Sequence, residues 1–409
     1  MIKSAHPCPE VETRAGSHRY RLKTTYAIAA YLAVIATVLG LGEFLYFAIA
    51  FPHRLTSAAT TPLINRVRWY LAHAADYNVV FIGDSRTFCG VHPELLDPLL
   101  GTSSINLAEF ADWFPTQLPM VQDIAASIPR GTTVVWSVGS QNFRRSTGIY
   151  RIYPVGIANG LRYLSWGVPT EGLVENILYF NPAMFFFNRR SNLRQGIMNF
   201  LDRPLDPGLS IVGSANAEGM AILRPPVGLA GLAPHDDAIT GLVSSYSQDP
   251  DVARVNTMVD GSEVTSLTVF FRRGSYLRIE LDPAYFRRKQ REFGPILAAE
   301  APGVEPAYWR LFEEMLRTFK ENGVRLIVNE IEEAPFLYGS PERRDMFRQF
   351  MRDKVEKRVL EEGFAYTRVD FDRFADDDYF DWDHLNSIGA SKFTPMLADQ
   401  LRPYVVDSQ

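Results

Sequence analysis

The side chains that could perform nucleophilic chemistry lie in two short stretches, far apart in the chain. The first stretch is Gly83-Asp84-Ser85, which directly follows the apolar run Val79-Val80-Phe81-Ile82. A short apolar run that ends in glycine is typical of a buried parallel strand that breaks into a tight turn, so Ser85 is predicted to lie on that turn. A serine hydroxyl becomes a nucleophile when a general base reaches it, and the strongest candidate base is His384. The sequence therefore predicts one site that is built from both stretches.

The histidine stretch supplies a base and a carboxylate that can orient it. His384 suits general acid–base catalysis because the reference pKa of an imidazole is near neutral. Asp381 lies three residues earlier and can hold the ring in one tautomer, whereas the adjacent Asp383 is expected to point elsewhere, in a structural or solvent-exposed role. Asp84 is expected to be a turn or capping carboxylate. The alternatives are a loop histidine with ordinary partners and a capping role for Ser85, but the coincidence of the two motifs favours catalysis.

A helix is expected directly after the serine turn. Phe88, Leu95, Leu96 and Leu99 are spaced to form one apolar helical face. The first N–H groups of such a helix would point back toward the hydroxyl of Ser85, where they would favour negative charge.

Strands and helices alternate on both sides of a long irregular segment. Helices are expected near residues 66–74, 118–127, 309–316, 341–361 and 386–401. Strands are expected near 79–83, 132–138, 324–328 and 366–369, and residues 102–111 are expected to form a strand that opens into a loop. This alternation predicts an α/β protein with a doubly wound, mostly parallel sheet and helices on both faces. Sites in such folds lie beyond the carboxyl ends of the strands, where both Ser85 and Asn142 are expected.

The alternation fails between about Arg145 and Gly303, where proline and glycine recur. We interpret residues 145–304 as an insertion and a candidate lid, with some helix near 173–200 and strands near 266–271 and 276–281. No catalytic group is assigned to it. The α/β domain is then formed by residues 76–144 and 305–409.

Composition limits the class of partner. The chain has 409 residues, of which 46% are hydrophobic and 22% charged, so it can bury a full core. A net charge of -5 provides no basic surface for nucleic acid. The two cysteines, Cys8 and Cys89, do not form a disulfide framework. The acidic run 376–378 lacks histidines at ligand spacing, so we expect a solvated turn and no metal site.

The N-terminal part predicts a membrane anchor. Residues 1–23 are polar and basic, and residues 24–51 are apolar over a length that can cross a bilayer, with Glu43 the one charge. The basic cluster predicts a cytoplasmic tail, so the rest of the chain would be extracytoplasmic and tethered to the cytoplasmic (inner) membrane by a single span. Residues 52–75 would form a linker and an approach helix. Ala48-Ile49-Ala50 has the form of a signal-peptide cleavage site, but the apolar stretch is longer than most signal peptides have, which favours an uncleaved anchor.

Four short blocks carry a resemblance to a known family. Gly83-Asp84-Ser85, Asn106 with its loop, Asn142 after a strand and Asp381-x-x-His384 resemble, in this order, the blocks of the SGNH (GDSL-like) hydrolase superfamily. The resemblance covers the two flanking segments, a little under half of the chain. The first block looks most like the membrane-anchored branch that is associated with O-acylation of cell-envelope polysaccharides. The resemblance implies an SGNH-like three-layer sandwich, ester chemistry at a catalytic triad of Ser85, His384 and Asp381, and no cofactor.

An oxyanion hole needs donors that point at the developing charge: the backbone N–H of Ser85, a second backbone N–H from the loop of Asn106, and a side-chain amide. The family usually has glycine in the second block, where this chain has Ala108 and Ala111. Ala111 stays a candidate because a backbone N–H survives the replacement if the dihedral angles permit. For the amide we prefer Asn142, with Gln141 as the alternative.

The sequence also leaves the roles of two other residues open. Arg86 is a weak candidate for contact with an anionic substrate group, and a solvated or salt-bridged arginine is the alternative. Asn106 is expected to tie its own loop together.

These features predict an extracytoplasmic serine esterase or O-acyltransferase that forms an acyl-enzyme. The resemblance implies an acyl donor and a cell-envelope glycan as partners, with a membrane-bound O-acyltransferase as a candidate partner protein. The alternative is a catalytically weak protein that binds glycan or acts as a scaffold for such an acyltransferase. A plain Rossmann-like binding domain is disfavoured, because the sequence has no glycine-rich phosphate loop.

Overall fold

The computed structural model describes residues 61–144, 149–169, 171–180, 252–260, 263–280, 304–381 and 383–405, together with residues 31, 34, 35, 37 and 38. The chain divides into two compact units, Met1–Ser57 and Ala58–Gln409. In the first unit the described residues are helical, and the rest of the segment expected to span a membrane lies outside the described residues. Within the part of the chain that the structure describes, no helix has the length and apolar character of a membrane span.

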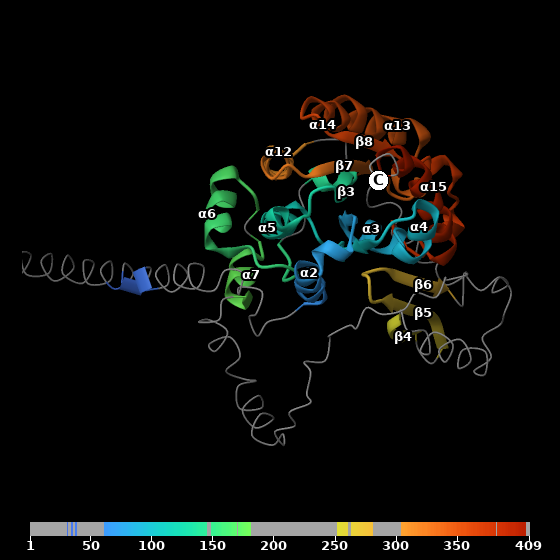
Figure 1. Cartoon of the computed structure of the whole chain (residues 1–409), viewed down its shortest axis with the longest axis horizontal. Helices are drawn as coiled ribbons and strands as arrows, with labels where there is room; N and C mark the ends of the chain where they lie inside the picture. Colours follow the sequence, from blue (N-terminus) through green and yellow to red (C-terminus); the bar gives the residue numbers. More distant parts are fainter. Residues whose placement is uncertain are drawn as a thin grey trace, which may run out of the picture. The chain divides into compact units, whose positions relative to one another are not determined.

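A five-stranded sheet forms the centre of the second unit, with the strand order β2-β1-β3-β7-β8 (Figure 1). The bounds are β1 Val79–Ile82, β2 Ser104–Asn106, β3 Thr133–Val138, β7 Arg325–Glu330 and β8 Ala365–Arg368. Every neighbouring pair is parallel, which confirms the predicted α/β fold. Because β2 and β3 lie on opposite sides of β1, the chain reverses its direction of winding there. In open α/β sheets, ligands bind in the crevice at such a point.

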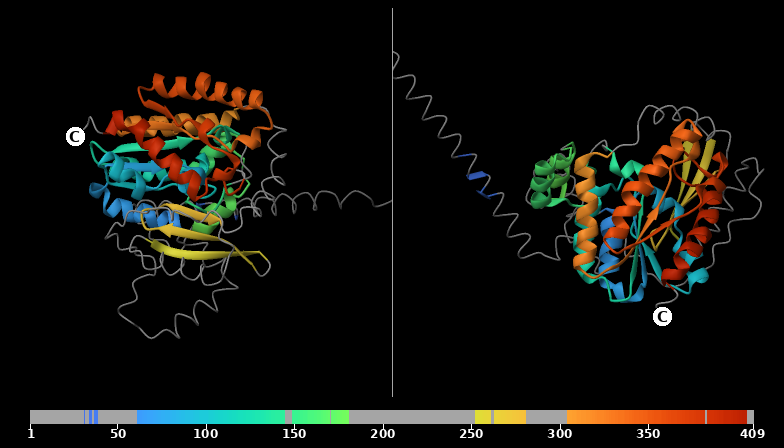
Figure 2. Two further views of the ribbon diagram at one scale, coloured as in Figure 1. Left: turned by 90° about the vertical axis from the view of Figure 1, so that its right-hand side faces the viewer. Right: turned by 90° about the horizontal axis from the view of Figure 1, so that it is seen from above.

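Helices cover both faces of this sheet (Figures 1 and 2). On one face α3 (Ser85–Gly90) and α4 (Pro93–Leu100) pack against α15 (Ser387–Val405), and on the other α5 (Phe114–Ile124) packs against α12 (Pro306–Glu321). The other described helices of this unit are α2 Pro62–Ala72, α6 Gly156–Trp166, α7 Leu173–Phe180, α13 Pro341–Phe350 and α14 Lys357–Glu361, with a π-helical turn, Met351–Glu356, between the last two. Short 3-10 turns span Ala74–Asp76, Ala125–Ser127, Ser140–Phe143, Pro335–Tyr338, Phe371–Arg373 and Asp376–Asp378.

The helix predicted after the serine turn is divided into two. Helix α3 ends at Gly90, and α4 begins at Pro93. The residue before a proline is disfavoured in the helical conformation, and His92 is accordingly extended, with φ -112° and ψ 104°. A helix does begin at Ser85, as expected, but the apolar residues of the expected face are divided between α3 and α4.

The core follows from the alternation of side chains along the strands. Val79 and Phe81 point to the face covered by α15, where they share one hydrophobic cluster with Phe393. On the opposite face, Trp136 packs against Phe312, with 5.3 Å between the ring centroids. All residues of β1 and β3 are buried, as expected for parallel strands covered on both sides.

The intervening segment contains a second, antiparallel sheet with the order β4-β5-β6. Strands β5 (Glu263–Phe271) and β6 (Tyr276–Glu280) confirm the two predicted strands, whereas β4 (Val252–Asp260) was not predicted. Helix α7 matches the start of the helix expected near 173–200, of which residues after 180 lie outside the described part.

Candidate active site

The predicted nucleophile lies at the first position of α3, directly beyond the carboxyl end of β1. Asp84 caps this helix, and its Oδ1 accepts a hydrogen bond of 3.0 Å from the backbone N–H of Arg86. A Cβ on Gly83 would lie 2.3 Å from the Thr87 hydroxyl oxygen, so the tight turn requires glycine. Ser85 is half-buried, and its hydroxyl makes no hydrogen bond with another described residue. Asp84 is thus the capping carboxylate that the sequence predicted.

The histidine lies on a closed loop that leads into α15. The backbone N–H of Phe380 donates to the carbonyl of His384 at 3.0 Å, and that of Asn386 donates to the carbonyl of Asp378 at 2.9 Å. Inside this loop the carboxylate of Asp381 accepts from the backbone N–H of His384 at 3.0 Å. Its two oxygens lie 2.8 and 2.9 Å from the ring Nδ1 of the same histidine. The structure therefore brings together Asp381 and His384 in the predicted orienting contact.

The sequence predicted that Asp383 would point away from His384, and this prediction is wrong. Its Oδ1 lies 3.2 Å from Nδ1 of His384, without hydrogen-bond geometry, and is buried with no other partner among the described residues. Burial raises the pKa of the Asp383 carboxyl, and so does the charge of Asp381. Two carboxylates thus converge on one imidazole.

These carboxylates change the titration of the candidate base. Burial alone would lower the pKa of His384, but the charges of Asp381 and Asp383 and the hydrogen bond to Asp381 outweigh it and raise the pKa to about 9. The near-neutral titration expected from the residue type is therefore corrected: the imidazole is mostly protonated at pH 7.

The other ring nitrogen of the histidine is available for chemistry. Nε2 of His384 is buried and has no hydrogen-bond partner among the described residues. Because Nδ1 faces the carboxylate of Asp381, the neutral ring carries its proton on Nδ1 and presents a lone pair at Nε2. No hydrogen bond joins Nε2 to Ser85 in this structure. Such bonds often form only when substrate is bound.

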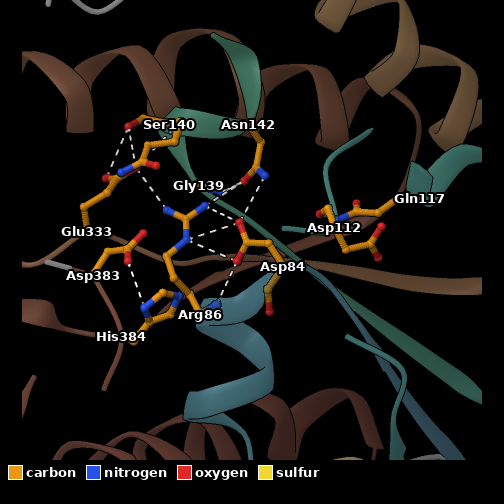
Figure 3. A network of polar contacts seen from close by, with 12 residues as sticks. Asp84, Arg86, Asp112, Gln117, Gly139, Ser140, Asn142, Glu333, Asp383 and His384 are labelled. Atoms are coloured by element: carbon orange, nitrogen blue, oxygen red, sulfur yellow. Dashed lines mark hydrogen bonds and ion pairs between the residues drawn. The ribbon is translucent and has the colours of Figure 1, made fainter. Parts of the chain in front are cut away.

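The serine turn and the histidine loop lie at the same edge of the sheet. The charge of Asp84 contributes to the raised pKa of His384. The charge of Arg86 acts to lower the pKa of Asp383. The hydroxyl of Thr394, on α15, also donates to the carbonyl of Gly90 at the end of α3, at 2.9 Å. Figure 3 shows Asp383 and His384 beside Arg86.

Ala111 has the backbone conformation of a glycine. Its φ is 54°, which makes it the one non-glycine residue with positive φ in the described ranges. The turn is closed by a hydrogen bond of 3.4 Å from the N–H of Asp112 to the carbonyl of Glu109. The N–H of Ala111 itself has no acceptor among the described residues. Asn106 ties this region together as predicted, because its amide donates to the carbonyls of Thr87 and Val91 at 3.1 Å.

The two candidate amides differ in their surroundings. Asn142 is buried, and its Nδ2 donates to Asp84 at 3.1 Å while its Oδ1 accepts from the N–H of Gly139 at 2.7 Å and from Arg86 at 2.9 Å. The second Nδ2 hydrogen has no acceptor among the described residues. Gln141 is half-buried, and its backbone N–H donates a hydrogen bond of 3.1 Å to the carboxylate of Glu333. The preference for Asn142 stays a prediction, and the structure adds that its amide also holds Asp84.

Arg86 is buried in a network of ion pairs. Its side chain is 2% exposed and forms buried ion pairs with Asp84 at 2.5 Å and Glu333 at 3.0 Å (Figure 3). A Cβ on Gly139 would lie 2.3 Å from the guanidinium, so glycine is needed where the arginine passes. Burial would raise the pKa of Asp84, but the charge of Arg86 outweighs it and lowers the pKa. The structure thus shows the salt-bridged alternative for Arg86, and contact with an anionic substrate group stays a prediction.

Glu333 is a residue of this site that was not predicted from the sequence. Its carboxylate is buried and accepts hydrogen bonds from the hydroxyls of Ser140, at 3.0 Å, and Tyr338, as well as from Arg86. The available signal was weak: the pair Glu332-Glu333 follows shortly after β7, at the edge of the sheet where ligands bind, but either residue alone resembles a surface charge.

Among the described residues, one group of side chains could hold a metal ion. It consists of Asp381, Asp383 and His384, whose potential ligand atoms lie within 4.8 Å of one another. We interpret the cluster as an acid–base group, since Nδ1 is hydrogen-bonded to Asp381 as in a hydrolytic triad. In the acidic run 376–378, Asp378 is not solvated as expected but buried and paired with Lys392 at 2.7 Å.

In comparisons with known proteins, no family model matches the chain, and no curated protein matches it either. The class that the described residues define is an α/β protein with a polar, partly buried site at the switch point of a parallel sheet.

Proposed function

We propose that the protein is an extracytoplasmic serine esterase or O-acyltransferase that acts through an acyl-enzyme. The observation that carries the proposal is the orientation of His384: its Nδ1 is held by Asp381, and its buried Nε2, at the edge of the sheet where Ser85 lies, has no hydrogen-bond partner among the described residues. A base oriented in this way is the arrangement that activates a serine hydroxyl. The substrate class, a cell-envelope polysaccharide, rests on the resemblance of the four sequence blocks to the SGNH superfamily.

The reaction would run in two steps. Oγ of Ser85 attacks the acyl carbon of a donor ester while Nε2 of His384 takes the hydroxyl proton. The N–H groups of Ser85 and Ala111 and the second Nδ2 hydrogen of Asn142 stabilise the oxyanion. The intermediate then expels the donor alcohol, which takes the proton from Nε2 and leaves acyl-Ser85. In the second step, water or a glycan hydroxyl attacks the acyl carbon and gives its proton to Nε2, and Oγ of Ser85 leaves with the proton from Nε2, which restores the free serine.

A fluorophosphonate probe tests the proposal directly. The full-length protein should be labelled on Ser85, and Ser85→Ala should abolish the labelling. His384→Ala and Asp381→Asn should each reduce labelling and turnover of a small acyl ester by about 10³-fold or more, and the losses should not add because the three residues act as one unit. Ser85→Ala should leave the melting temperature nearly unchanged, since the hydroxyl makes no hydrogen bond with any residue that the structure describes. An unlabelled but folded wild-type protein would exclude the hydrolase.

The alternative is a catalytically weak protein that binds glycan or acts as a scaffold for a membrane acyltransferase. Two observations favour it: Ser85 is not hydrogen-bonded to His384, and the raised pKa of His384 leaves little neutral base at pH 7. In this case glycan binding would persist in Ser85→Ala and no probe would react. For the proposed location, a reporter fused after Gln409 should be active only outside the cytoplasm.

A further inference from the structure

The β5–β6 hairpin of the intervening segment is fixed to the α/β domain by its turn. Arg273, in the turn, pairs with Asp97 of α4 at 2.5 Å, and its backbone carbonyl accepts from the N–H of Asn106 at 2.9 Å. Ser275 donates to the buried Glu94 at 2.9 Å. Gly274 has φ 89°, and a Cβ there would lie 2.0 Å from the carbonyl oxygen of Asn106. The hairpin turn is thus held against β2 and α4 by buried charge and by close backbone contact.

This attachment places Tyr276, the first residue of β6, in an aromatic cluster at the candidate site. Its side chain is 5% exposed. Its ring centroid lies 5.1 Å from that of Phe110, 5.6 Å from that of Phe88 and 6.3 Å from that of Phe380. Phe270, on β5, covers it from behind at 5.0 Å. Tyr276 therefore joins rings from α3, from the loop before Ala111 and from the histidine loop.

Two of these rings hold the imidazole of His384. Phe380 is stacked on it, with centroids 5.4 Å apart and planes at 14°, and Phe110 meets it edge-on at 5.8 Å. Phe110 also directly precedes Ala111, whose N–H is a candidate oxyanion donor. A shift of Phe110 would therefore move both the base and the donor turn.

We infer that Tyr276 is a positioning residue for His384 and for the turn at Ala111, which it orders through Phe110 and Phe380. The inference deepens the proposed function and rests on it. It assigns the intervening segment a place in the catalytic site, where the sequence analysis had placed no group. Ring contacts of this kind have a preferred geometry, so removing the central ring leaves the two outer rings free to rotate. A misplacement of about 1 Å is enough to reduce a catalytic rate by about 10²-fold.

The test compares Tyr276→Ala with Tyr276→Phe in the full-length protein. Phe319→Ala serves as the control for loss of a buried aromatic ring, because Phe319 lies on α12 near its end, before β7 begins, at the opposite edge of the sheet. We expect Tyr276→Ala to lower kcat for a small acyl ester by about 10²-fold with KM changed less than about threefold. Tyr276→Phe, which keeps the ring, should stay within about twofold of the wild type. Phe319→Ala should lose stability but keep kcat.

A second readout does not depend on activity. Hydrogen–deuterium exchange at Cε1 of the histidine ring, followed by mass spectrometry, reports the surroundings and the titration of His384. We expect Tyr276→Ala to change the exchange rate of His384 and Tyr276→Phe to leave it unchanged. An unchanged exchange rate in folded Tyr276→Ala would overturn the inference, whatever the activity. A wild type without Ser85 labelling would instead contradict the proposed function.

Discussion

Arg86 and Glu333 form a buried ion pair of 3.0 Å, although 247 residues separate them in the chain. The arginine follows the candidate nucleophile on α3, and the glutamate follows β7, so the pair joins the two flanking segments of the α/β domain at the edge where the site lies. Both side chains are 2% exposed. The pair therefore fixes the serine turn against the segment that follows β7.

Removal of this arginine should be strongly destabilising. In Arg86→Met, Asp84 and Glu333 would stay buried without their cation, and a buried charge that loses its partner costs about 3–5 kcal/mol. We expect a loss of this size in the free energy of unfolding, measured by denaturant titration. Arg373→Met is the matched control, since it removes an exposed pair with Asp370 and should change the stability by less than about 1 kcal/mol. Equal effects of both variants would contradict the structural role of the network.

The rate of acylation should rise with pH. His384 acts as a base only when neutral, and its pKa is raised to about 9, so the rate of labelling by a fluorophosphonate should increase up to about pH 9. Asp383→Asn removes one of the charges that raise this pKa, and should move the whole profile to lower pH while the rate at its plateau is retained. A profile that levels off below pH 7 in the wild type would contradict the two-carboxylate arrangement.

The contribution of His384 to the free energy of unfolding should fall with rising pH, whereas the acylation rate rises. Because the pKa of His384 is higher in the folded state than its ordinary value of 6.5, its contribution to stability is fully present below about pH 6.5 and is lost as pH rises through about 9. The stability difference between wild type and His384→Gln should shrink over this window. This comparison separates the titration of His384 from that of other groups.

Much of the site was predictable because its residues lie in local patterns. The apolar run before Ser85 and the Asp-x-x-His spacing each specify a strand end or a loop without knowledge of the rest of the chain. Glu333 was not predictable in this way, since its partner Arg86 is distant in sequence and either residue alone resembles a surface charge. The contact between Tyr276 and the rings around His384 also depends on how the second sheet docks, which no local pattern contains.

The left-handed backbone conformation of Ala111 could likewise not be predicted from its residue type. Alanine rarely adopts positive φ, so the sequence left open whether its dihedral angles would suit an oxyanion donor. The structure gives it φ 54°. The glycine-like turn is therefore specified by the surrounding loop and not by the residue itself.

Substitution at this position should separate backbone geometry from side-chain identity. The left-handed conformation costs an alanine about 1–2 kcal/mol, and glycine avoids this cost but loses about 0.4–1 kcal/mol through the entropy of the unfolded chain. We expect Ala111→Gly to be slightly more stable than wild type, by up to about 1 kcal/mol, with labelling of Ser85 retained. Ala111→Val should lose both stability and labelling, because a β-branched residue rarely tolerates this φ. Full labelling of Ala111→Val would exclude this turn from the oxyanion hole.

The last prediction concerns the acceptor of the acyl group. Nε2 of His384 is buried, and its ring is covered by Phe110 and Phe380, so little space is left for bulk water at the base. The predicted membrane tether would keep the site near the membrane, where activated acyl donors emerge, and hydrolysis needs neither a tether nor a covered site. We therefore expect the purified full-length protein, given an acyl ester and an oligosaccharide, to form acylated sugar in excess over free acid. Mass spectrometry of the sugar and titration of released acid measure the two products, with Ser85→Ala as the blank. If free acid is the only product at every acceptor concentration, including with acceptors from the native envelope, the protein is an esterase and the transferase proposal fails.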